Sequence, residues 1–329
     1  PELVRDCRGN TIAAGPGLAG PDVVVSSTRE PNSLHSRTVL MASDIYLCRF
    51  VEDHLREMEA DPSISSRPAA YRALRALGLD DFGSVLWRMP MPAYPRLSSV
   101  LPAMASDEVT KSWTGNHGHA LLLQSSNFVR SCADNFTSIT GTTLRNRKIL
   151  DFGCGYGRFL RLFSFFTDDI VGVDAWEMSL EHSRQAGFAD IVFKSEEVPQ
   201  SLPLRPEIEF AFAFSIFTHL SERSTLACLG AIRSVMVPGG VLAITIRPVE
   251  YWPAAAHADL ASRPDDVERM LNDHTTRGFA FLPHFSREDY GDTSLTLDWL
   301  RKNLQGWTIE AMDRSVSDGL QRYIFLKAV

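Results

Sequence analysis

Residues 148–158 read Lys-Ile-Leu-Asp-Phe-Gly-Cys-Gly-Tyr-Gly-Arg, an apolar run that leads into three glycines at alternate positions. This pattern predicts a buried strand that turns sharply beneath a ligand and continues into a helix. Glycine accepts positive φ angles and lets a ligand approach the backbone, and the first turn of a helix offers free N–H groups. The stretch therefore predicts a binding site for a nucleoside-like cofactor.

The spacing of the glycines bears on which cofactor binds. A dinucleotide-binding loop has the spacing Gly-x-Gly-x-x-Gly, whereas the sixth position counted from Gly153 is Arg158. This difference disfavours a nicotinamide-dependent dehydrogenase, which is the rival enzyme on a related fold. A glycine loop without other motifs would also fit a tight strand-to-helix turn that binds no ligand.

The stretch resembles the first motif of the class I S-adenosylmethionine-dependent methyltransferases, an acidic residue followed by Gly-x-Gly-x-Gly. The matching residues are Asp151, Gly153, Gly155 and Gly157. Downstream, an apolar segment ends in Asp174, about 20 residues after the loop, as a ribose-binding acid requires. Two further segments, residues 208–220 and 237–245, follow in the order of this family. The resemblance covers residues 120–329 and implies S-adenosylmethionine as the cofactor.

The resemblance also implies individual cofactor contacts. Asp174 would hold both ribose hydroxyls, and Ser215 would border the cofactor after the fourth strand. The other implied contacts are Ala175 or Trp176 beside the ribose, and Ser195 or Glu196 at the adenine. The chain departs from the family here, because it lacks the common Asp after the third strand.

Apolar segments alternate with helical ones through the second half of the chain. Strands are predicted at 148–152, 170–174, 190–194, 208–214 and 241–246. This alternation predicts a parallel sheet covered by helices on both faces. A helix over 293–303 precedes runs at 307–312 and 321–327, which the resemblance implies are an antiparallel hairpin. The predicted fold class is α/β, a Rossmann-like seven-stranded class I methyltransferase sheet with an N-terminal helical cap.

Three regions are predicted along the chain. Residues 1–37 are rich in Gly, Pro and Ser and predict an extended arm or linker. Residues 38–118 predict a helical cap, and residues 119–329 the methyltransferase domain, which opens with a long helix to about 139. Within that domain, 248–292 is too long for a connector and predicts a lid-like insertion. Because the chain begins with Pro1, we expect a piece of a longer protein.

Two helices are expected inside the cap. Apolar residues recur at helical spacing over 38–60, and a second, shorter helix runs from about 70 to 77 and stops at Gly78. Four prolines between 87 and 102 exclude regular structure there and predict a strap. Residues 1–118 are also the expected place for an oligomer contact or a fusion partner.

Composition excludes several classes of protein. No apolar run approaches the ~20 residues that cross a bilayer, so no membrane insertion is predicted. Lys plus Arg number 33 against 40 Asp plus Glu, giving a net charge of −7 that disfavours nucleic acid. The 5 cysteines include no Cys-x-x-Cys pair and predict reduced thiols in the cytoplasm without a zinc site. The sequence contains no compact pair of carboxylates that would predict a site for another metal ion.

The chemistry follows from the implied cofactor. A sulfonium methyl group is already electrophilic, so the protein must align donor and acceptor at ~3 Å, exclude water and deprotonate a hydroxyl acceptor. Two histidines are candidates for the general base, His219 after the fourth strand and His284 on the insertion. The alternative for His219 is a structural role at the start of a helix, where its ring would only form a hydrogen bond with the backbone.

Aromatic and polar residues outside the sheet are candidates for binding the acceptor. Trp113 and His117 lie in a glycine-containing segment that would fold over the cofactor or the acceptor, or act as a plain hinge. On the insertion the candidates are Trp252, Tyr290 and Asp292, although Tyr-Gly-Asp also suits a turn and helix cap.

The sequence narrows the class of acceptor. The signatures of base-methylating enzymes, Asn/Asp-Pro-Pro-aromatic and Pro-Cys, are absent, which favours an oxygen or nitrogen of a small molecule or glycan. Residues 282–327 resemble methyltransferases that accompany bacterial polysaccharide-modifying enzymes, which favours O-methylation of a sugar. The alternatives are N-methylation of a small molecule or natural product, and a non-catalytic scaffold that binds partners through residues 1–118.

Overall fold

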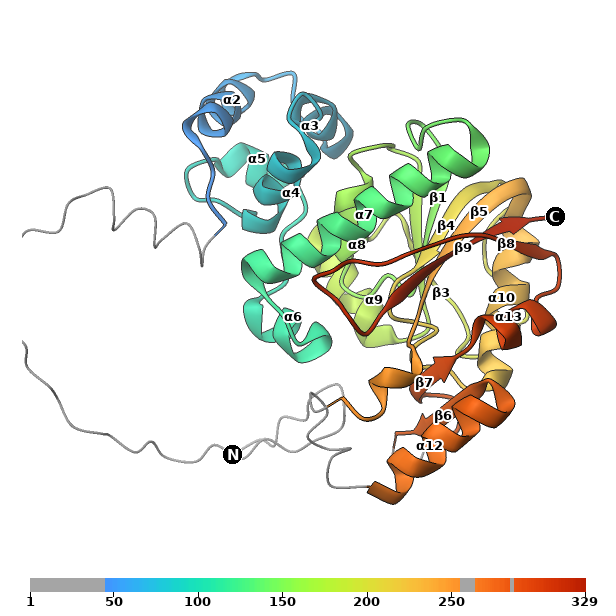
Figure 1. Ribbon diagram of the computed structural model, residues 1–329. Helices are drawn as coiled ribbons and strands as arrows, with labels where there is room; N and C mark the ends of the chain where they lie inside the picture. Colours follow the sequence, from blue (N-terminus) through green and yellow to red (C-terminus); the bar gives the residue numbers. More distant parts are fainter. Residues whose placement is uncertain (1–44, 255–263, 285–286) are drawn as a thin grey trace, which may run out of the picture.

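The computed structural model describes residues 45–254, 264–284 and 287–329. The predicted arm at 1–37 and the start of the first predicted helix lie outside these residues. A central sheet carries a group of helices at one end and a small helix-and-hairpin unit at the other (Figure 1). Among the described residues, none of the helices has both the length and the apolar composition to span a bilayer.

The sheet has seven strands in the order β3-β2-β1-β4-β5-β9-β8. The first five strands are parallel, and β9 runs antiparallel to both β5 and β8. Their bounds are β1 Ile149–Phe152, β2 Ile170–Asp174, β3 Val192–Lys194, β4 Ile208–Ala213, β5 Met236–Ile246, β8 Trp307–Asp313 and β9 Arg322–Ala328. The predicted fold class is confirmed. The strand order reverses between β1 and β4, the point at which such sheets bind ligands.

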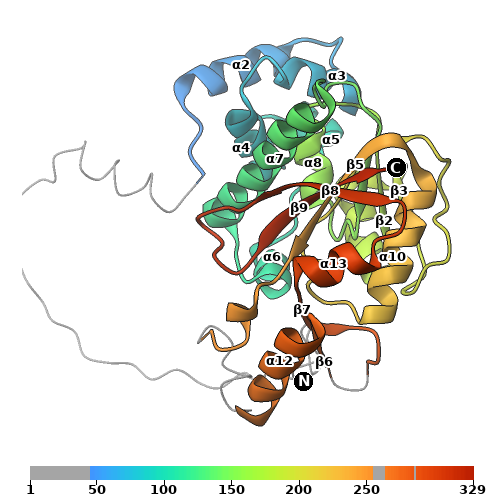
Figure 2. The ribbon, with the colours of Figure 1, turned by 45° about the vertical axis from the view of Figure 1, so that its right-hand side comes forward.

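Helices cover both faces of the sheet (Figures 1 and 2). One face packs against α7 (Gly118–Thr140), α8 (Arg158–Phe163) and α9 (Glu177–Ser183), which continues into a π-helical turn at Arg184–Phe188. The other packs against α10 (Glu222–Val235) and α13 (Leu297–Asn303). Along β4, Phe210 and Phe212 face the first layer while Ala211 and Ala213 face the second, because successive side chains alternate across a strand.

Phenylalanine rings fill the layer between α7, α8 and the sheet. Phe128 of α7 is fully buried, and its ring makes edge contacts with Phe159, Phe214 and Tyr323 at centroid distances of 5.2, 4.8 and 5.1 Å. Edge-to-face contacts of this kind stabilise beyond the buried area alone. Phe128 therefore joins α7 to α8, to β9 and to the residue that follows β4.

Residues 45–114 contain five helices, and the buried side chains between Leu47 and Leu101 form a core of their own. The helices are α2 Arg49–Ala60, α3 Arg67–Leu74, α4 Leu79–Arg88, α5 Pro95–Val100 and α6 Asp107–Thr114. The expectation of no regular structure over 87–102 is wrong, because Pro95 occupies the first turn of α5, where its missing N–H costs nothing. The second predicted helix ends at Leu74, before Gly78.

Two arginines, Arg67 at the start of α3 and Arg75 directly after its end, join these helices to the sheet domain. Arg75 donates from Nε to the carbonyl of Ser164 at 2.9 Å and pairs with Asp168 at 2.5 Å. Arg67 pairs with Asp190 at 2.6 Å. The N-terminal helices are thus held beside α8 and the end of the π-helical turn, although their standing as a separate domain stays a prediction.

The predicted insertion contains regular structure. A 3-10 turn at Val249–Tyr251 is followed by α12 (Pro264–Arg277) and by the hairpin of β6 (Phe279–Pro283) and β7 (Gly291–Leu295). The predicted helix at 293–303 is wrong in its first residues, since 293–295 belong to β7. Helix α13 begins at Leu297, where the Thr296 side chain accepts from the N–H of Trp299 at 3.1 Å.

We predict that Phe128→Ala lowers the free energy of unfolding by about 3 to 5 kcal/mol, because it removes a buried ring and leaves a cavity. Chemical denaturation would measure it. The matched control is Leu123→Ala on the same helix, where the side chain is 45% exposed and a change within about 0.5 kcal/mol is expected. Equal losses in the two variants would contradict this account of the core.

Candidate active site

The glycine loop joins β1 to α8, and all three of its glycines have positive φ angles of 81°, 56° and 78°. A Cβ on Gly153 would lie 2.2 Å from Ile216, and one on Gly157 would lie 2.6 Å from Phe188. A Cβ on Gly155 would meet only the Trp113 ring, at 3.8 Å. The packing of neighbouring side chains thus requires glycine at positions 153 and 157, whereas the space beside Gly155 is open and belongs to a cavity.

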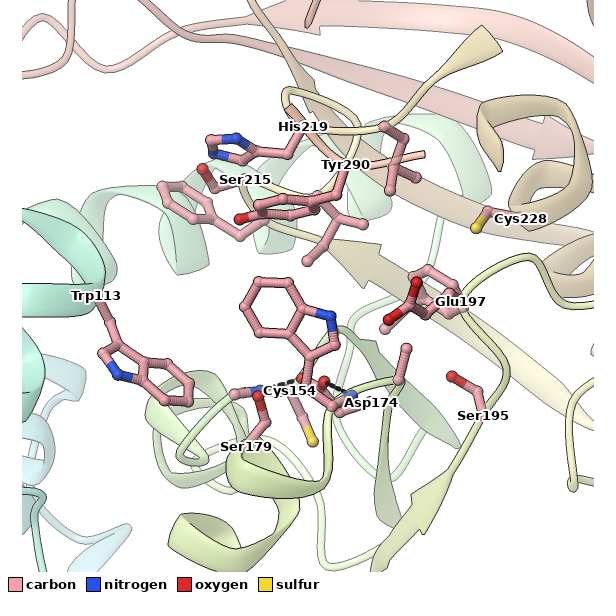
Figure 3. A pocket seen from close by; sticks show the side chains of 18 of the residues that line it. Trp113, Cys154, Asp174, Ser179, Ser195, Glu197, Ser215, His219, Cys228 and Tyr290 are labelled. Carbon is pink, nitrogen blue, oxygen red and sulfur yellow. Dashed lines mark hydrogen bonds between the residues drawn. The ribbon is translucent and has the colours of Figure 1, made fainter. Parts of the chain in front are cut away.

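A cavity of about 360 Å³ lies over this loop, at the carboxyl ends of the strands. The predicted residues that line it are Trp113, Gly153, Gly155, Asp174, Ala175, Trp176, Ser195, Glu196, Ser215, His219, His284 and Tyr290. Figure 3 shows Asp174 and Ser195 on one side, with His219 and Tyr290 opposite. The structure therefore brings together most residues that the sequence selected.

Asp174 ties the end of β2 to the glycine loop. One carboxylate oxygen accepts from the N–H of Gly155 at 2.9 Å and the other from the N–H of Trp176 at 2.8 Å (dashed lines in Figure 3). Burial raises the pKa of Asp174, and these two hydrogen bonds oppose that rise. The carboxylate is therefore placed at the cavity wall and oriented by the backbone.

Asp151 lies within β1, beneath the loop and not on the cavity wall. Its side chain is buried, and Oδ2 has no hydrogen-bond partner among the described residues. Burial, with the negative charge of Asp174, raises the pKa of Asp151 well above its usual range. The structure thus places Asp151 beneath the loop, and its predicted contact with the cofactor stays a prediction.

Ser215 follows β4 with a φ angle of 60°, which is uncommon for a residue other than glycine. Its N–H donates to Oγ1 of Thr245 at 2.7 Å, which holds the turn against β5. Non-glycine residues held at positive φ concentrate in functional sites. The turn points the chain from the sheet toward His219.

His219 is enclosed by hydrogen bonds on both ring nitrogens. Nδ1 lies 2.8 Å from the carbonyl oxygen of Gly291, and Nε2 lies 3.2 Å from Nη2 of Arg247. Because a carbonyl only accepts and a guanidinium only donates, Nδ1 carries the proton. Burial and the charge of Arg247 lower the pKa of His219 to about 3. The imidazole is therefore neutral, and the lone pair on Nε2 already accepts a hydrogen bond from Arg247.

Asp292 joins His284 and Arg247 at the same wall. Its Oδ2 accepts from Nε2 of His284 at 2.9 Å, and Oδ1 pairs with Nη1 of Arg247 at 2.5 Å. Burial alone would raise the pKa of Asp292, but the His284 hydrogen bond and the Arg247 charge outweigh it and hold this pKa well below its usual range. Asp292 thus acts on His284 and does not line the cavity itself.

Two predicted acceptor contacts lie elsewhere. Trp252 is only 1% exposed and belongs to the insertion's own core, where its Nε1 donates to Ser294 at 2.7 Å. His117 precedes α7 with a half-exposed side chain that lies 3.5 Å from Asp107. Neither side chain lines the cavity, so neither enters the proposal below.

Two arginines of the cavity wall, Arg158 and Arg247, were not among the site residues predicted from the sequence. Arg158 entered only as a mismatch in glycine spacing, although its position after the third glycine placed it at the loop. Arg247 directly follows the strand predicted at 241–246, and this position at the carboxyl end of a strand was the available signal. Among residues 45–254, 264–284 and 287–329, no group of three or more His, Cys, Asp or Glu side chains could hold a metal ion.

Comparison with known proteins agrees with this geometry. Residues 149–240 match the family model described as a methyltransferase domain. No curated protein sequence matches the chain.

Solved structures with a similar arrangement are distant in sequence. An S-adenosylmethionine-dependent methyltransferase from Mesorhizobium loti has 14% identity over 59% of this chain and 96% of that chain, with a TM-score of 0.40. A magnesium protoporphyrin IX methyltransferase from Synechocystis, solved with bound S-adenosylhomocysteine, has 13% identity over 64% and 86% of the two chains, with a TM-score of 0.43.

We predict that Gly155→Ala weakens binding of S-adenosylhomocysteine more than about tenfold, since the new methyl group projects into the cavity. Calorimetry would measure the affinity. The control is Gly239→Ala, which has a φ angle of 80° and open space around a new Cβ. Both variants carry the backbone strain of about 1 to 2 kcal/mol, so similar loss of affinity in both would contradict a role for Gly155 in the cavity.

A second prediction concerns stability in acid. The pKa of His219 in the folded state, about 3, lies below the ordinary value of 6.5. Between these two pH values His219 is protonated in the unfolded chain and neutral in the folded chain. Stability from this group is present above pH 6.5 and is lost as the pH falls. Between pH 7 and pH 5 the loss is of the order of 2 kcal/mol. In urea unfolding, the free energy of unfolding of His219→Gln should fall less between pH 7 and pH 5 than that of the wild type. Parallel pH profiles of the two proteins would contradict this prediction.

Proposed function

We propose that this chain, a class I S-adenosylmethionine-dependent methyltransferase, methylates a hydroxyl group of a small molecule, with a sugar or glycan as the preferred acceptor. The observation that carries the proposal is the hydrogen bond between His284, which lines the cavity, and Asp292, which lies behind it. A hydroxyl acceptor must lose a proton during transfer, whereas the sulfonium donor already provides an activated methyl group.

The glycine-loop side of the cavity fits the cofactor. Gly155 leaves open space above the loop, and the carboxylate of Asp174 is oriented toward the same space by two backbone N–H groups. In the proposal Asp174 holds the ribose, Trp176 and Ala175 lie beside it, and Ser195 or Glu196 contacts the adenine. The bound cofactor supplies the electrophilic methyl group.

The opposite side of the cavity fits the proton transfer. His284 donates from Nε2 to Asp292, so its neutral ring has the lone pair on Nδ1, and no described residue bonds that nitrogen. A carboxylate behind an imidazole fixes its tautomer and stabilises the protonated ring. We therefore assign the general base to His284.

His219 takes a different part in this proposal. Both of its nitrogens are engaged, and its low pKa keeps it neutral. Its ring stacks on Tyr290 at a centroid distance of 5.3 Å and an interplanar angle of 16°. His219 thus positions Tyr290 and the adjacent insertion, and the catalytic role considered from the sequence passes to His284 alone.

The class of acceptor rests on the sequence and on the make-up of the wall. Residues 282–327 resemble methyltransferases that accompany polysaccharide-modifying enzymes. Tyr290 and Trp113 offer flat apolar surfaces with polar tips, which suit the faces and hydroxyls of a sugar ring. The four described cysteines are free thiols, in keeping with the cytoplasmic location that we propose.

We predict methyl transfer from labelled donor to members of a panel of nucleotide sugars, free glycans and phenols. With the best acceptor, His284→Gln should lower kcat by about 10² to 10⁴-fold with little change in KM, because it removes the base and spares binding. Labelled product would be quantified by mass spectrometry. Label found only on protein or nucleic acid would refute the proposed acceptor class.

The matched control is His117→Gln, which makes the same substitution outside the cavity and should leave kcat unchanged. Calorimetry with S-adenosylhomocysteine should give the same affinity for both variants. An unchanged kcat in His284→Gln would remove the histidine from the mechanism while leaving the methyl transfer itself intact.

A further inference from the structure

An exposed arginine of the insertion lies against two aromatic rings of the cavity wall. The guanidinium carbon of Arg287 lies 4.9 Å from the ring centroid of Trp176 and 5.7 Å from that of Tyr290. Both rings line the cavity, whereas Arg287 is exposed and lies outside it. A cation over the face of an aromatic ring is attracted by the negative charge density of that face.

The two acids that follow Arg287 in the sequence are not its partners. Asp289 accepts from Nε of Arg223 at 3.3 Å and from the hydroxyl of Ser221 at 2.7 Å. Glu288 is exposed, and no ion pair joins it or Arg287 to a described residue. The contacts with the two rings, and not an ion pair, therefore fix where the guanidinium of Arg287 lies.

The two rings come from opposite sides of the cavity and meet across it. Trp176 follows β2, and its N–H donates to Asp174 on the proposed cofactor side at 2.8 Å. Tyr290 precedes β7 on the insertion, and Figure 3 shows it opposite Asp174. The centroids of the two rings are 4.8 Å apart, with an interplanar angle of 60°. Arg287 thus covers a contact between the insertion and the segment that carries Asp174.

The same arginine is joined to the proposed general base. The N–H of Arg287 donates to the carbonyl oxygen of His284 at 3.1 Å, and the N–H of His284 donates to the carbonyl oxygen of Tyr290 at 3.0 Å. The rings of His284 and Tyr290 meet edge to face, with centroids 5.7 Å apart and an interplanar angle of 79°. His284 is therefore held between two residues that both contact Trp176.

We propose that Arg287 is a positioning residue for methyl transfer, because its contacts with Trp176 and Tyr290 hold His284 in a fixed place relative to the bound donor. The inference rests on the proposed function, in which His284 removes the proton of the acceptor and Asp174 holds the ribose. The base and the donor are held by different segments of the chain, and a displacement of about 1 Å between reacting groups lowers the rate. Moving the insertion away from Trp176 would break the cation–π contact, so Arg287 opposes that displacement.

The first test measures the single-turnover rate of methyl transfer in the full chain, with saturating donor and the best acceptor. Arg287→Met keeps an unbranched side chain and removes the charge, and it should lower this rate about three- to tenfold, as expected for exposed cation–π contacts with two rings. Arg287→Lys keeps the charge and should recover part of the loss. The matched control is Arg301→Met on α13, also exposed and outside the cavity, which should leave the rate unchanged.

Double variants separate positioning from a general structural effect. In His284→Gln, adding Arg287→Met should change the remaining rate by less than about twofold, because the group that Arg287 positions is already gone. In Trp176→Leu the same addition should also have a reduced effect, because the nearer ring is missing. Equal losses from Arg287→Met in the wild-type and His284→Gln backgrounds would overturn the inference, as would an unchanged rate in Arg287→Met alone.

NMR of histidine-labelled protein gives a readout that does not depend on turnover. The ring proton signal of His284, identified by its absence in His284→Gln, should broaden in Arg287→Met and stay unchanged in Arg301→Met. A signal that Arg287→Met leaves unchanged overturns the inference. Failure of the wild type to methylate any hydroxyl acceptor, with a signal that responds as expected, would instead overturn the proposed function.

Discussion

The carboxylate of Asp174 fixes the shape on which the rest of the site depends. It accepts N–H groups from Gly155 in the loop and from Trp176 after β2, so one buried side chain joins two adjacent strand ends. The loop can take this course because its glycines adopt positive φ angles, and Ile216 and Phe188 fill the space that side chains would need. The cavity wall is thus formed by backbone geometry before any ligand contributes.

The sheet builds only half of the cavity, and segments outside it supply the other half. The loop after β4 pairs with β7 of the insertion, since Gly291 donates to the carbonyl of His219 at 2.8 Å and Thr293 to that of Thr218 at 2.9 Å. This pairing carries Tyr290 and Asp292 to the strand ends. Trp113 at the end of α6 closes the opposite side. The proposed cofactor contacts therefore lie on the sheet, and the proposed acceptor contacts lie mostly outside it.

The local sequence pattern was sufficient to predict the sheet and the glycine loop, because the alternation of strands with helices and the spacing of glycines can be read from residues close together in the sequence. It was insufficient for the polar cluster, since Arg247 and Asp292 are separated by 45 positions and their pairing depends on how the insertion folds back. Trp252 was misplaced because an aromatic residue on a predicted lid gives no local sign of whether it packs inward. The start of β7 was misassigned because strand pairing with β6 outweighed a helical pattern.

The distribution of charge in the cavity links these halves. Arg247 and Asp292 neutralise each other at 2.5 Å, which leaves two imidazoles of different character beside one ion pair. Arg247 donates to His219, and its charge helps to lower the pKa of that ring, whereas Asp292 accepts from His284. In the proposed function these different partners separate the structural role of His219 from the proton-transfer role of His284. Since Asp292 and His284 both lie on the insertion, the proton transfer that we propose depends on the insertion and not on the sheet alone.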